Sequence, residues 1–331
     1  MIGTAAIIGI GGPILTHDER TLLDQHRPAG VILFGRNIQE PTQLHRLTAT
    51  IRECLSPDAV LMVDQEGGRV ARLRPPHWKR HPPAGVIGAL VDARPEAAAR
   101  AAWLHGALIG LQCAAEGFDT VCAPVMDLRL DGRDQVVGDR GWHVDPEITA
   151  MLGRAMADGL LAAGMQPVMK HLPGHGRARV DSHLALPVVD DAEAADLVPF
   201  TRNADLGWAM TAHVLNPAWD TDHPATLSAT TIKRIIRGEI DFQGVLVSDD
   251  LAMGALAGTP AARVRAALEA GCDLAMYCSG EPEANAALLE ACPAPRNAAL
   301  ERLASARAQV AAAVCPLDGA LMWAERETLL A

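Results

Sequence analysis

The stretch HVDPEITAMLGRAMADGLLAAGMQPVMKH, residues 143–171, holds a helix signal followed at once by a strand signal. Asp145 can cap a helix whose first turn contains Pro146, and Gly164 marks the end of that helix. The apolar run QPVMK (166–170) comes directly afterwards. A helix that leads into a short apolar strand is the repeating unit of parallel α/β folds.

Similar units recur along the chain, where short apolar runs bounded by Gly, Pro, Asp or Asn alternate with Ala- and Leu-rich segments of helical spacing. The expected strands are residues 5–10, 30–34, 59–63, 119–125, 166–170, 207–213, 244–248 and 273–277. The clearest helices are expected at residues 40–54, 94–116, 146–163, 261–270 and 282–290, with a closing helix at about 296–314.

The expected strands are almost entirely apolar, as parallel strands are when both of their faces are covered. Eight strand–helix units predict a single TIM-barrel domain, a (β/α)₈ barrel over residues 1–331, which can be irregular or incomplete. A doubly wound open sheet is the structural alternative. GIGGP (9–13) does not favour a dinucleotide-binding fold, because its spacing is not GxGxxG and it ends in a proline.

The composition is that of a globular protein, with 49% hydrophobic and 21% charged residues. A net charge of −11 argues against nucleic acid or an anionic membrane as partner, because both require clustered Lys and Arg. No segment offers the roughly 20 apolar residues of a membrane span, and the N-terminal stretch lacks the features of a signal peptide. Seven scattered cysteines without a CxxC pair argue against disulfides. We therefore expect a cytoplasmic protein, and we expect a monomer.

Charged residues in otherwise apolar surroundings cluster at the C-terminal ends of the expected strands. They are Asp64, Glu66, Arg69 and Arg72, then Asp127, Asp139 and Arg140, then Lys170 and His171, then His213, and finally Asp249 and Asp250. In a barrel these strand ends converge on the face that carries active sites. Solvated surface charges would be scattered equally at strand starts, so the pattern favours one functional site.

Asp249 and Asp250 interrupt the hydrophobic stretch GVLVSDDLAMGAL (244–256). One of these carboxylates, or Ser248, can cap the helix expected to follow. Asp249 is nearer to the strand, so we expect it to point into the site, where it can act as a nucleophile or a base.

The loop KHLPGHGRARVDSH (170–183) allows two kinds of site. The possible metal ligands are His171, His175, Asp181 and His183. Two observations argue against a metal. The first strand lacks the HxH of metal-dependent barrel hydrolases, and a lysine and two arginines would place further positive charge beside a metal cation. An acid/base site fits better, because a carboxylate two residues from a histidine can orient its ring. A simple turn or cap at 181–183 is the structural alternative.

Six motifs, taken in order, resemble glycoside hydrolase family 3 in its bacterial β-N-acetylglucosaminidase branch. They are GVILFGRN (30–37), VDQEGGRVARL (63–73), APVMDL (123–128), VMKHLPGHG (168–176) with DSH (181–183), MTAH (210–213) and VSDDLAM (247–253). The resemblance extends over about residues 5–280, and the combination of the KHLPGHG, DSH and SDDL motifs is highly specific.

The resemblance implies a retaining exo-β-N-acetylglucosaminidase that removes terminal non-reducing β-linked GlcNAc from anhydro-muropeptides during peptidoglycan recycling. Asp249 would be the nucleophile, and His183 the general acid/base, paired with Asp181 in a dyad. The sugar-binding positions of the family map to Asp64, Arg72, Arg140, Lys170 and His171. The implied partner is a carbohydrate substrate, and neither a metal nor a cofactor is expected.

The sequence departs from the family pattern at three places. Leu172 stands where the family usually has Phe, and RGWHVDP (140–146) replaces the usual arginine–serine–phenylalanine start, which affects the packing around Arg140. RARV (177–180) is more basic than expected. We interpret its two arginines as solvated, with contact to an acidic aglycone as the alternative. His175 is assigned a structural hydrogen bond within the loop.

Other functions stay open at this point. A β-N-acetylglucosaminide phosphorylase of the same family would pass the glycosyl unit to phosphate, since a histidine avoids the repulsion that a carboxylate exerts on an anion. A metal-dependent barrel hydrolase is a further alternative. A non-catalytic sugar-binding barrel is disfavoured, because Asp249, Asp181 and His183 are all present.

Overall fold

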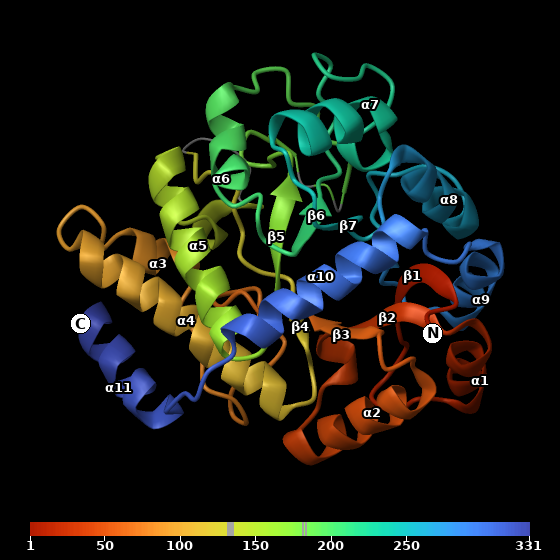
Figure 1. The fold of residues 1–331 in the computed structure, drawn as a ribbon, viewed down its shortest axis with the longest axis horizontal. Helices are drawn as coiled ribbons and strands as arrows, with labels where there is room; N and C mark the ends of the chain where they lie inside the picture. Colours follow the sequence, from red (N-terminus) through yellow and green to blue (C-terminus); the bar gives the residue numbers. More distant parts are fainter. Residues whose placement is uncertain (131–135, 181, 183) are drawn as a thin grey trace.

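The computed structural model describes residues 1–130, 136–180, 182 and 184–331, and these form an eight-stranded parallel barrel surrounded by helices (Figure 1). The strands are β1 (Thr4–Gly9), β2 (Pro28–Leu33), β3 (Val60–Val63), β4 (Thr120–Val121), β5 (Gln166–Leu172), β6 (Trp208–Thr211), β7 (Val245–Val247) and β8 (Ala275–Tyr277). They pair in the order β7-β6-β5-β4-β3-β2-β1-β8. At the seam, β7 and β8 are joined by an isolated bridge between Val247 and Leu274. The predicted (β/α)₈ barrel is confirmed, and so is its incomplete closure.

The helices on the outside of the barrel follow the expected segments closely. They are α1 (His17–His26), α2 (Pro41–Cys54), α3 (Ala84–Gly88), α4 (Pro95–Ala115), α5 (Pro146–Ala162), α6 (Val198–Thr201), α7 (Ala229–Thr231), α8 (Pro260–Ala270), α9 (Pro282–Ala291), α10 (Asn297–Ala313) and α11 (Gly319–Leu330). The five internal helices predicted from the sequence, α2, α4, α5, α8 and α9, differ from their expected ranges by no more than one residue at either end.

Helix α5 and strand β5 show why the chain folds as the sequence predicts. The side chain of Asp145 caps α5 by accepting hydrogen bonds from two amides of the first turn. Gly164 has a φ of 80°, a conformation that glycine adopts without steric cost, and it turns the chain into β5. All seven residues of β5 are buried, and the strand carries Lys170 and His171 to the C-terminal end of the barrel.

Strand β4 is much shorter than the expected range 119–125. The Ala123 amide turns back to donate to the carbonyl of Val121 at 2.8 Å, and Pro124 has no amide hydrogen to donate. The amides of these two residues therefore add no bond to the ladder, and the strand ends at Val121, although their carbonyls still accept from the amides of Val168 and Lys170 in β5.

Two crossovers depart from the regular strand–helix pattern. Between β5 and β6 the chain forms the 3₁₀ turn η3 (Ala194–Leu197) and the four-residue helix α6. Between β6 and β7 it forms the 3₁₀ turn η4 (Ala225–Leu227), and α7 then passes into a π-helix, η5 (Ile232–Glu239). Two further 3₁₀ turns are η1 (Gly35–Asn37) and η2 (Gly138–Arg140).

Of the last two helices, α10 covers the barrel and α11 lies outside it, against α4 (Figure 1). Helix α10 lies across the N-terminal ends of the central strands, where Gln309 accepts a hydrogen bond from the amide of Gly207 at 2.9 Å. Helix α11 packs against α4, and Glu325 receives two hydrogen bonds from Arg100, at 2.7 and 2.8 Å. Arg326 of α11 reaches further inward and contacts Nδ1 of His81 at 2.9 Å.

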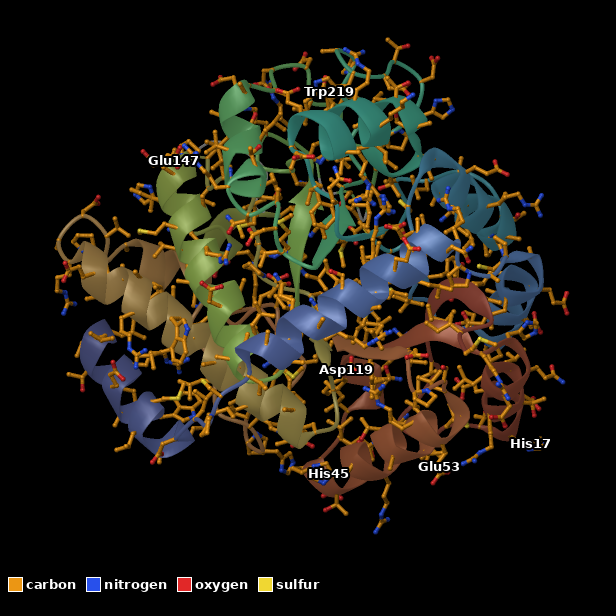
Figure 2. The ribbon with its side chains drawn as sticks, in the orientation of Figure 1. His17, His45, Glu53, Asp119, Glu147 and Trp219 are labelled. Carbon is orange, nitrogen blue, oxygen red and sulfur yellow. The ribbon has the colours of Figure 1, made fainter. Side chains whose placement is uncertain are left out.

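Apolar side chains fill most of the interior, and many polar side chains are exposed, although others, such as Lys170 and Asp127, are buried. His17, His45, Glu53 and Glu147 are examples of the exposed set (Figure 2). All seven cysteines are free thiols, and Cys315 is the exposed one. Among the described residues, no helix is both long enough and apolar enough to cross a membrane.

Candidate active site

A cavity of about 230 Å³ opens at the C-terminal ends of the strands. Six of the eight predicted site residues border it, namely Asp64, Arg72, Arg140, Lys170, His171 and Asp249. The other two, Asp181 and His183, lie outside the described residues, although Ser182 between them borders the cavity. The fold therefore brings together side chains from the loops after β3, β4, β5 and β7.

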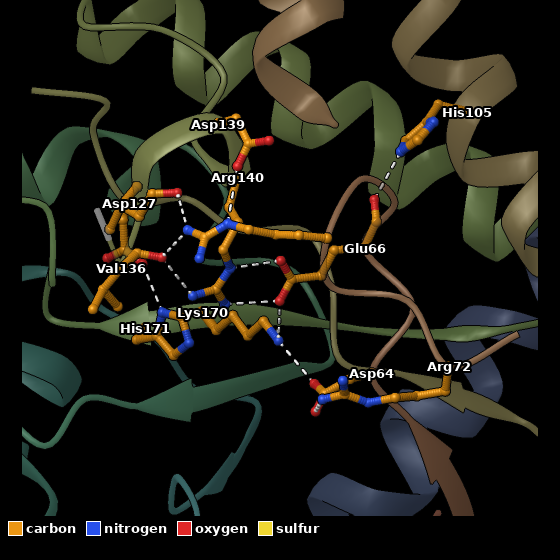
Figure 3. Close-up of polar contacts among 12 residues, drawn as sticks. Asp64, Glu66, Arg72, His105, Asp127, Val136, Asp139, Arg140, Lys170 and His171 are labelled. Atoms are coloured by element: carbon orange, nitrogen blue, oxygen red, sulfur yellow. Dashed lines mark hydrogen bonds and ion pairs between the residues drawn. The ribbon is translucent and has the colours of Figure 1, made fainter. Parts of the chain in front are cut away.

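Lys170 bridges two carboxylates from the loop after β3 (Figure 3). Its ammonium group lies 3.0 Å from Oδ1 of Asp64 and 2.6 Å from Oε1 of Glu66, and its side chain is only 3% exposed. Burial alone would lower the pKa of Lys170, but the two carboxylates outweigh burial and raise that pKa above its usual value. Lys170 is therefore charged at neutral pH.

Arg140 holds Glu66 from the other side (Figure 3). Its Nε and Nη2 each donate to one carboxylate oxygen of Glu66 at 2.8 Å, the bidentate geometry that arginine forms best. Burial would raise the pKa of Glu66, but Arg140 and Lys170 lower it to about 2. The structure thus assigns Arg140 a contact that fixes Glu66 in the cavity wall.

Asp64 is held at both of its oxygens. Lys170 occupies Oδ1, and Nη2 of Arg72 donates to Oδ2 at 3.1 Å. Burial alone would raise the pKa of Asp64, but Lys170 and Arg72 hold it well below its usual value. The guanidinium of Arg72 also lies over the ring of Phe34, at 5.3 Å from the centroid. Asp64 is therefore an ionised acceptor in a fixed position.

His171 is oriented by a buried carboxylate from the loop after β4. Its Nδ1 lies 2.6 Å from Oδ2 of Asp127. Burial would raise the pKa of Asp127, but His171 lowers it below its usual value, so the carboxylate is ionised and Nδ1 of His171 donates. Nε2 of His171 is then the ring atom that faces a ligand, as an acceptor when the ring is neutral.

His175 has the structural place predicted for it. Its amide donates to Oδ1 of Asp127 at 2.6 Å, and its Nε2 lies 3.3 Å from Oγ of Ser182 in the same loop. Burial lowers the pKa of the His175 imidazole. The ring is therefore neutral at physiological pH, and its side chain borders the cavity between His171 and Ser182.

Asp249 lies two residues beyond β7. Its amide donates to Oγ1 of Thr211 at 3.3 Å, and its Oδ1 accepts from the amide of Asp250 at 2.8 Å. Burial alone would raise the pKa of Asp249, but His213, His171 and the Asp250 amide bring it below its usual value. The Asp249 carboxylate is therefore ionised at neutral pH. In the described part of the chain no Lys or Arg forms an ion pair with it, so it is available for a reaction.

Asp250, unlike Asp249, uses its carboxylate to hold the main chain. Its Oδ1 accepts from the amides of Ala252 at 2.8 Å and Cys278 at 2.9 Å, so it ties the end of β7 to the end of β8. The residues after Asp250 form turns, so the expected helix cap is wrong and the carboxylate caps a turn instead. Burial raises the pKa of Asp250.

Two residues of the site, Glu66 and Asp127, were not assigned roles from the sequence. Both stand in motifs at strand ends, VDQEGGR and APVMDL, which was the available signal. Their partners are distant in the chain, so the motifs alone gave no reason to separate them from other strand-end charges. The cavity wall is completed by apolar side chains, namely Phe34, Met210, Met253 and Met276.

The two arginines of the loop after β5 have different surroundings. The interpretation of Arg177 as solvated is wrong, because its side chain is only 13% exposed and donates to Oδ2 of Asp196 at 2.6 Å. It also pairs with Glu193 at 3.1 Å, so it anchors the crossover to β6. Arg179 is 65% exposed and lies 3.4 Å from Asp191.

Residues 8–311 match the profile of the glycosyl hydrolase family 3 N-terminal domain. The chain is 44% identical over 297 residues to a beta-hexosaminidase from Alkalilimnicola ehrlichii, covering 87% of this chain and 84% of that protein. It is 41% identical over 304 residues to a beta-hexosaminidase from Pseudomonas aeruginosa, covering 90% and 86%.

Among solved structures, NagZ from Neisseria gonorrhoeae in complex with N-trifluoroacetyl-D-glucosamine matches with a TM-score of 0.87 and 34% identity. The match covers 100% of this chain and 98% of that one. A barrel of this kind, with these relatives, defines a glycoside hydrolase. The chain belongs to glycoside hydrolase family 3, among its bacterial β-N-acetylglucosaminidases, and the resemblance predicted from the six motifs is confirmed.

Proposed function

We propose that the protein is a retaining exo-β-N-acetylglucosaminidase, carried by a single domain over residues 1–331. The observation that carries this proposal is that Asp249, ionised and without a Lys or Arg partner among the described residues, borders the same cavity as the ion-paired Asp64, Glu66 and Lys170. One carboxylate is available for a reaction, and the others are held in place to bind.

The size and polarity of the cavity suit one neutral sugar ring. Its volume of about 230 Å³ is below the range of roughly 300–1,000 Å³ that is usual for drug-sized ligands. Its charged groups are largely paired with one another, so they offer fixed donors and acceptors to hydroxyl groups without a net charge for an ion. The gonococcal relative in complex with N-trifluoroacetyl-D-glucosamine supports an N-acylated glucosamine in this position.

The reaction would run in two steps through a glycosyl-enzyme intermediate. An oxygen of Asp249 attacks the anomeric carbon, the bond to the leaving oxygen breaks, and protonated His183 gives its proton to that oxygen. Neutral His183 then takes a proton from water, whose oxygen attacks the anomeric carbon and releases the Asp249 carboxylate. Asp181 would orient the His183 ring in both steps.

The bacterial beta-hexosaminidases among the relatives support a substrate from the cell wall, where β-linked GlcNAc is abundant. We propose that the substrates are GlcNAc-terminated muropeptides released in peptidoglycan recycling. Seven free thiols suit a reducing compartment, so we place this reaction in the cytoplasm.

The first experiment compares turnover of 4-nitrophenyl-β-GlcNAc with that of the corresponding glucoside. We expect strong preference for the GlcNAc substrate, and preference for the glucoside would contradict the N-acetyl assignment. Asp249→Asn should lower kcat by at least about 10⁴-fold, because the amide that replaces the carboxylate cannot form the glycosyl ester intermediate. Asp222→Asn, on the exposed surface, is the matched control. Near wild-type turnover by the Asp249→Asn variant would exclude the proposed nucleophile.

The phosphorylase and metal-dependent alternatives are tested with the same substrate. We expect GlcNAc as the product with or without phosphate in the buffer, whereas GlcNAc 1-phosphate would identify a phosphorylase. We also expect turnover to survive treatment with EDTA, since side chains carry the nucleophile and acid/base roles. Activity that is lost with EDTA and restored by a metal would contradict the proposed mechanism.

A further inference from the structure

A second hollow, of about 550 Å³, lies beside the sugar cavity. It is bordered by residues of the segment 68–83, which follows β3, and by Asp139. Arg69 borders both hollows, and its Nε donates to Oδ1 of Asp139 at 3.0 Å where the two meet. The two hollows therefore share the side chain of Arg69 in their borders.

The second hollow has a positively charged border, although the chain as a whole is negatively charged. The chain has a net charge of −11, but Arg69, Arg74 and Arg80 border the hollow against one carboxylate, that of Asp139. His81 adds no charge at neutral pH, because burial holds the pKa of its imidazole well below the usual value. Among the described residues, the border carries an excess of two positive charges, three arginines against one aspartate.

Arg74 and Arg80 form no ion pair with a carboxylate in the part of the chain that the structure describes. Arg74 is nevertheless held in place, because Nε donates to the carbonyl of Ala71 at 2.5 Å and Nη2 donates to the carbonyl of Arg69 at 3.0 Å. Carbonyl oxygens fix the guanidinium without neutralising it, so the positive charge of Arg74 is left for a ligand.

The segment that presents these arginines is pinned to the rest of the fold. The Gly68 amide donates to the carbonyl of His81 at 3.0 Å, and the Glu66 amide donates to the carbonyl of Val70 at 2.9 Å. Gly67 has a φ of 99°, and a Cβ there would lie 2.3 Å from the carbonyl oxygen of Pro82, so this turn requires glycine. A pinned segment loses little conformational freedom when it binds a ligand.

We propose that the second hollow binds the leaving-group side of the substrate, and that Arg74 and Arg80 take a carboxylate carried by the aglycone. The proposal deepens the function proposed above and rests on it. In the sugar cavity Lys170 is already paired with carboxylates, which suits a neutral ring. In the second hollow Arg74 and Arg80 have no carboxylate partner in the part of the chain that the structure describes, and a guanidinium offers two parallel donors to a planar carboxylate.

The test uses two substrates that differ only in the charge of the aglycone. One is GlcNAc β-1,4-linked to N-acetylmuramic acid, and the other is the same disaccharide with its carboxylate converted to the methyl amide. We expect the wild-type kcat/KM to be higher for the acid than for the amide. The preference should shrink as salt is raised from 0.05 to 0.5 M, because exposed charges are screened.

Variants assign the effect to the two arginines. The ratio of kcat/KM between acid and amide should fall about threefold in Arg74→Gln and in Arg80→Gln, and about tenfold in the double variant. Arg234→Gln, an exposed arginine on the π-helix η5, is the matched control and should leave the ratio unchanged.

The outcomes separate this inference from the function on which it rests. Equal kcat/KM for acid and amide in the wild type, or an unchanged ratio in the double variant, would overturn the aglycone site alone. Failure to hydrolyse both disaccharides and 4-nitrophenyl-β-GlcNAc would overturn the proposed function together with the aglycone site.

Discussion

The His213 imidazole donates from Nε2 to the main-chain carbonyl of Asp250, 2.9 Å away, beside the proposed nucleophile. Because a carbonyl can only accept, Nε2 carries the hydrogen. The other ring nitrogen lies 2.8 Å from Oγ1 of Thr226, which lies 2.8 Å from Oγ1 of Thr211. Since Thr211 accepts the amide of Asp249, a hydrogen-bonded ring closes around the Asp249–Asp250 peptide.

Thr226→Val should break this ring without changing the volume of the side chain much. We expect kcat for 4-nitrophenyl-β-GlcNAc to fall by up to about 10²-fold, because small displacements of a reacting group are costly. The KM should change little, since Thr226 does not border the cavity. The free energy of unfolding should fall by about 1–3 kcal/mol, because a buried partner of His213 is lost.

Thr226→Ser is the control for this prediction, because it keeps the hydroxyl group and should keep most of the kcat. Steady-state kinetics and thermal unfolding of both variants provide the comparison. Equal kcat values in the Val and Ser variants would show that the ring does not position Asp249.

Lys170→Met and Arg326→Met remove two deeply buried cations, and we expect opposite results. Lys170 lies between Asp64 and Glu66, so its loss leaves two buried carboxylates short of a partner and should lower the free energy of unfolding by about 3–5 kcal/mol. Arg326 is 2% exposed and has no carboxylate partner among the described residues. Its contacts are His81 and the ring of Trp323, at 4.2 Å from the centroid.

Burial lowers the pKa of Arg326 to about 10, which indicates that its charge is poorly compensated. Replacement by a methionine of similar length should therefore be neutral or stabilising. Denaturant unfolding of the two variants measures both changes in the free energy of unfolding. A loss of several kcal/mol in Arg326→Met would mean that its charge is compensated after all.

Glu66→Gln should change the dependence of stability on pH. The pKa of Glu66 falls from 4.5 to about 2 in the folded protein. Its ionisation therefore stabilises the fold fully above about pH 4.5, and this contribution is lost as the pH falls toward about 2. Across this window Glu66 contributes a slope of up to about 1.4 kcal/mol per pH unit.

We expect the Gln variant to be less stable at pH 7, since Arg140 and Lys170 lose a charged partner, and to show a flatter decline between pH 4.5 and 3. Urea unfolding at several pH values measures both quantities. If the free energy of unfolding of the variant falls as steeply as that of the wild type, other carboxylates account for the loss of stability at acid pH.

Asp127→Asn should reverse the tautomer of His171. The Asn oxygen can still accept the amide of His175, which places the NH₂ group against Nδ1 of His171. Nδ1 must then accept, so Nε2 carries the hydrogen and can no longer accept from a sugar hydroxyl. We expect the KM to rise about tenfold, which corresponds to the loss of one hydrogen bond. The ¹⁵N NMR shifts of Nδ1 and Nε2 should exchange values, because the hydrogen moves from one ring nitrogen to the other. An unchanged tautomer would contradict this orientation of His171.

The elements that sequence patterns predicted are those with a local signal. Charged residues lie within two residues of the ends of β3, β5 and β7, next to apolar runs, and this pattern depends only on neighbouring residues. Helices α4 and α5 begin at prolines and follow long helical repeats, so their bounds were predicted closely.

The features that the sequence did not predict are mainly contacts between residues far apart in the chain. Glu66 pairs with Arg140, 74 positions away, and Asp127 pairs with His171, 44 positions away, so no local pattern distinguishes them from solvated charges. The π-helix η5 also has ordinary apolar spacing in sequence, so the residue pattern gave no signal for its altered hydrogen bonding. The roles of Asp181 and His183 stay predictions.

The family profile ends at residue 311, before α11 begins at Gly319, although the match to the gonococcal NagZ structure covers the whole chain. Through Arg326 this helix nevertheless contacts His81, whose carbonyl holds the glycine turn of the loop after β3. In evolutionary terms, substitutions in α11, which lies beyond the family profile, can tilt the loop that borders both hollows. Substrate preference can therefore diverge between relatives while every residue that touches the sugar ring is inherited unchanged.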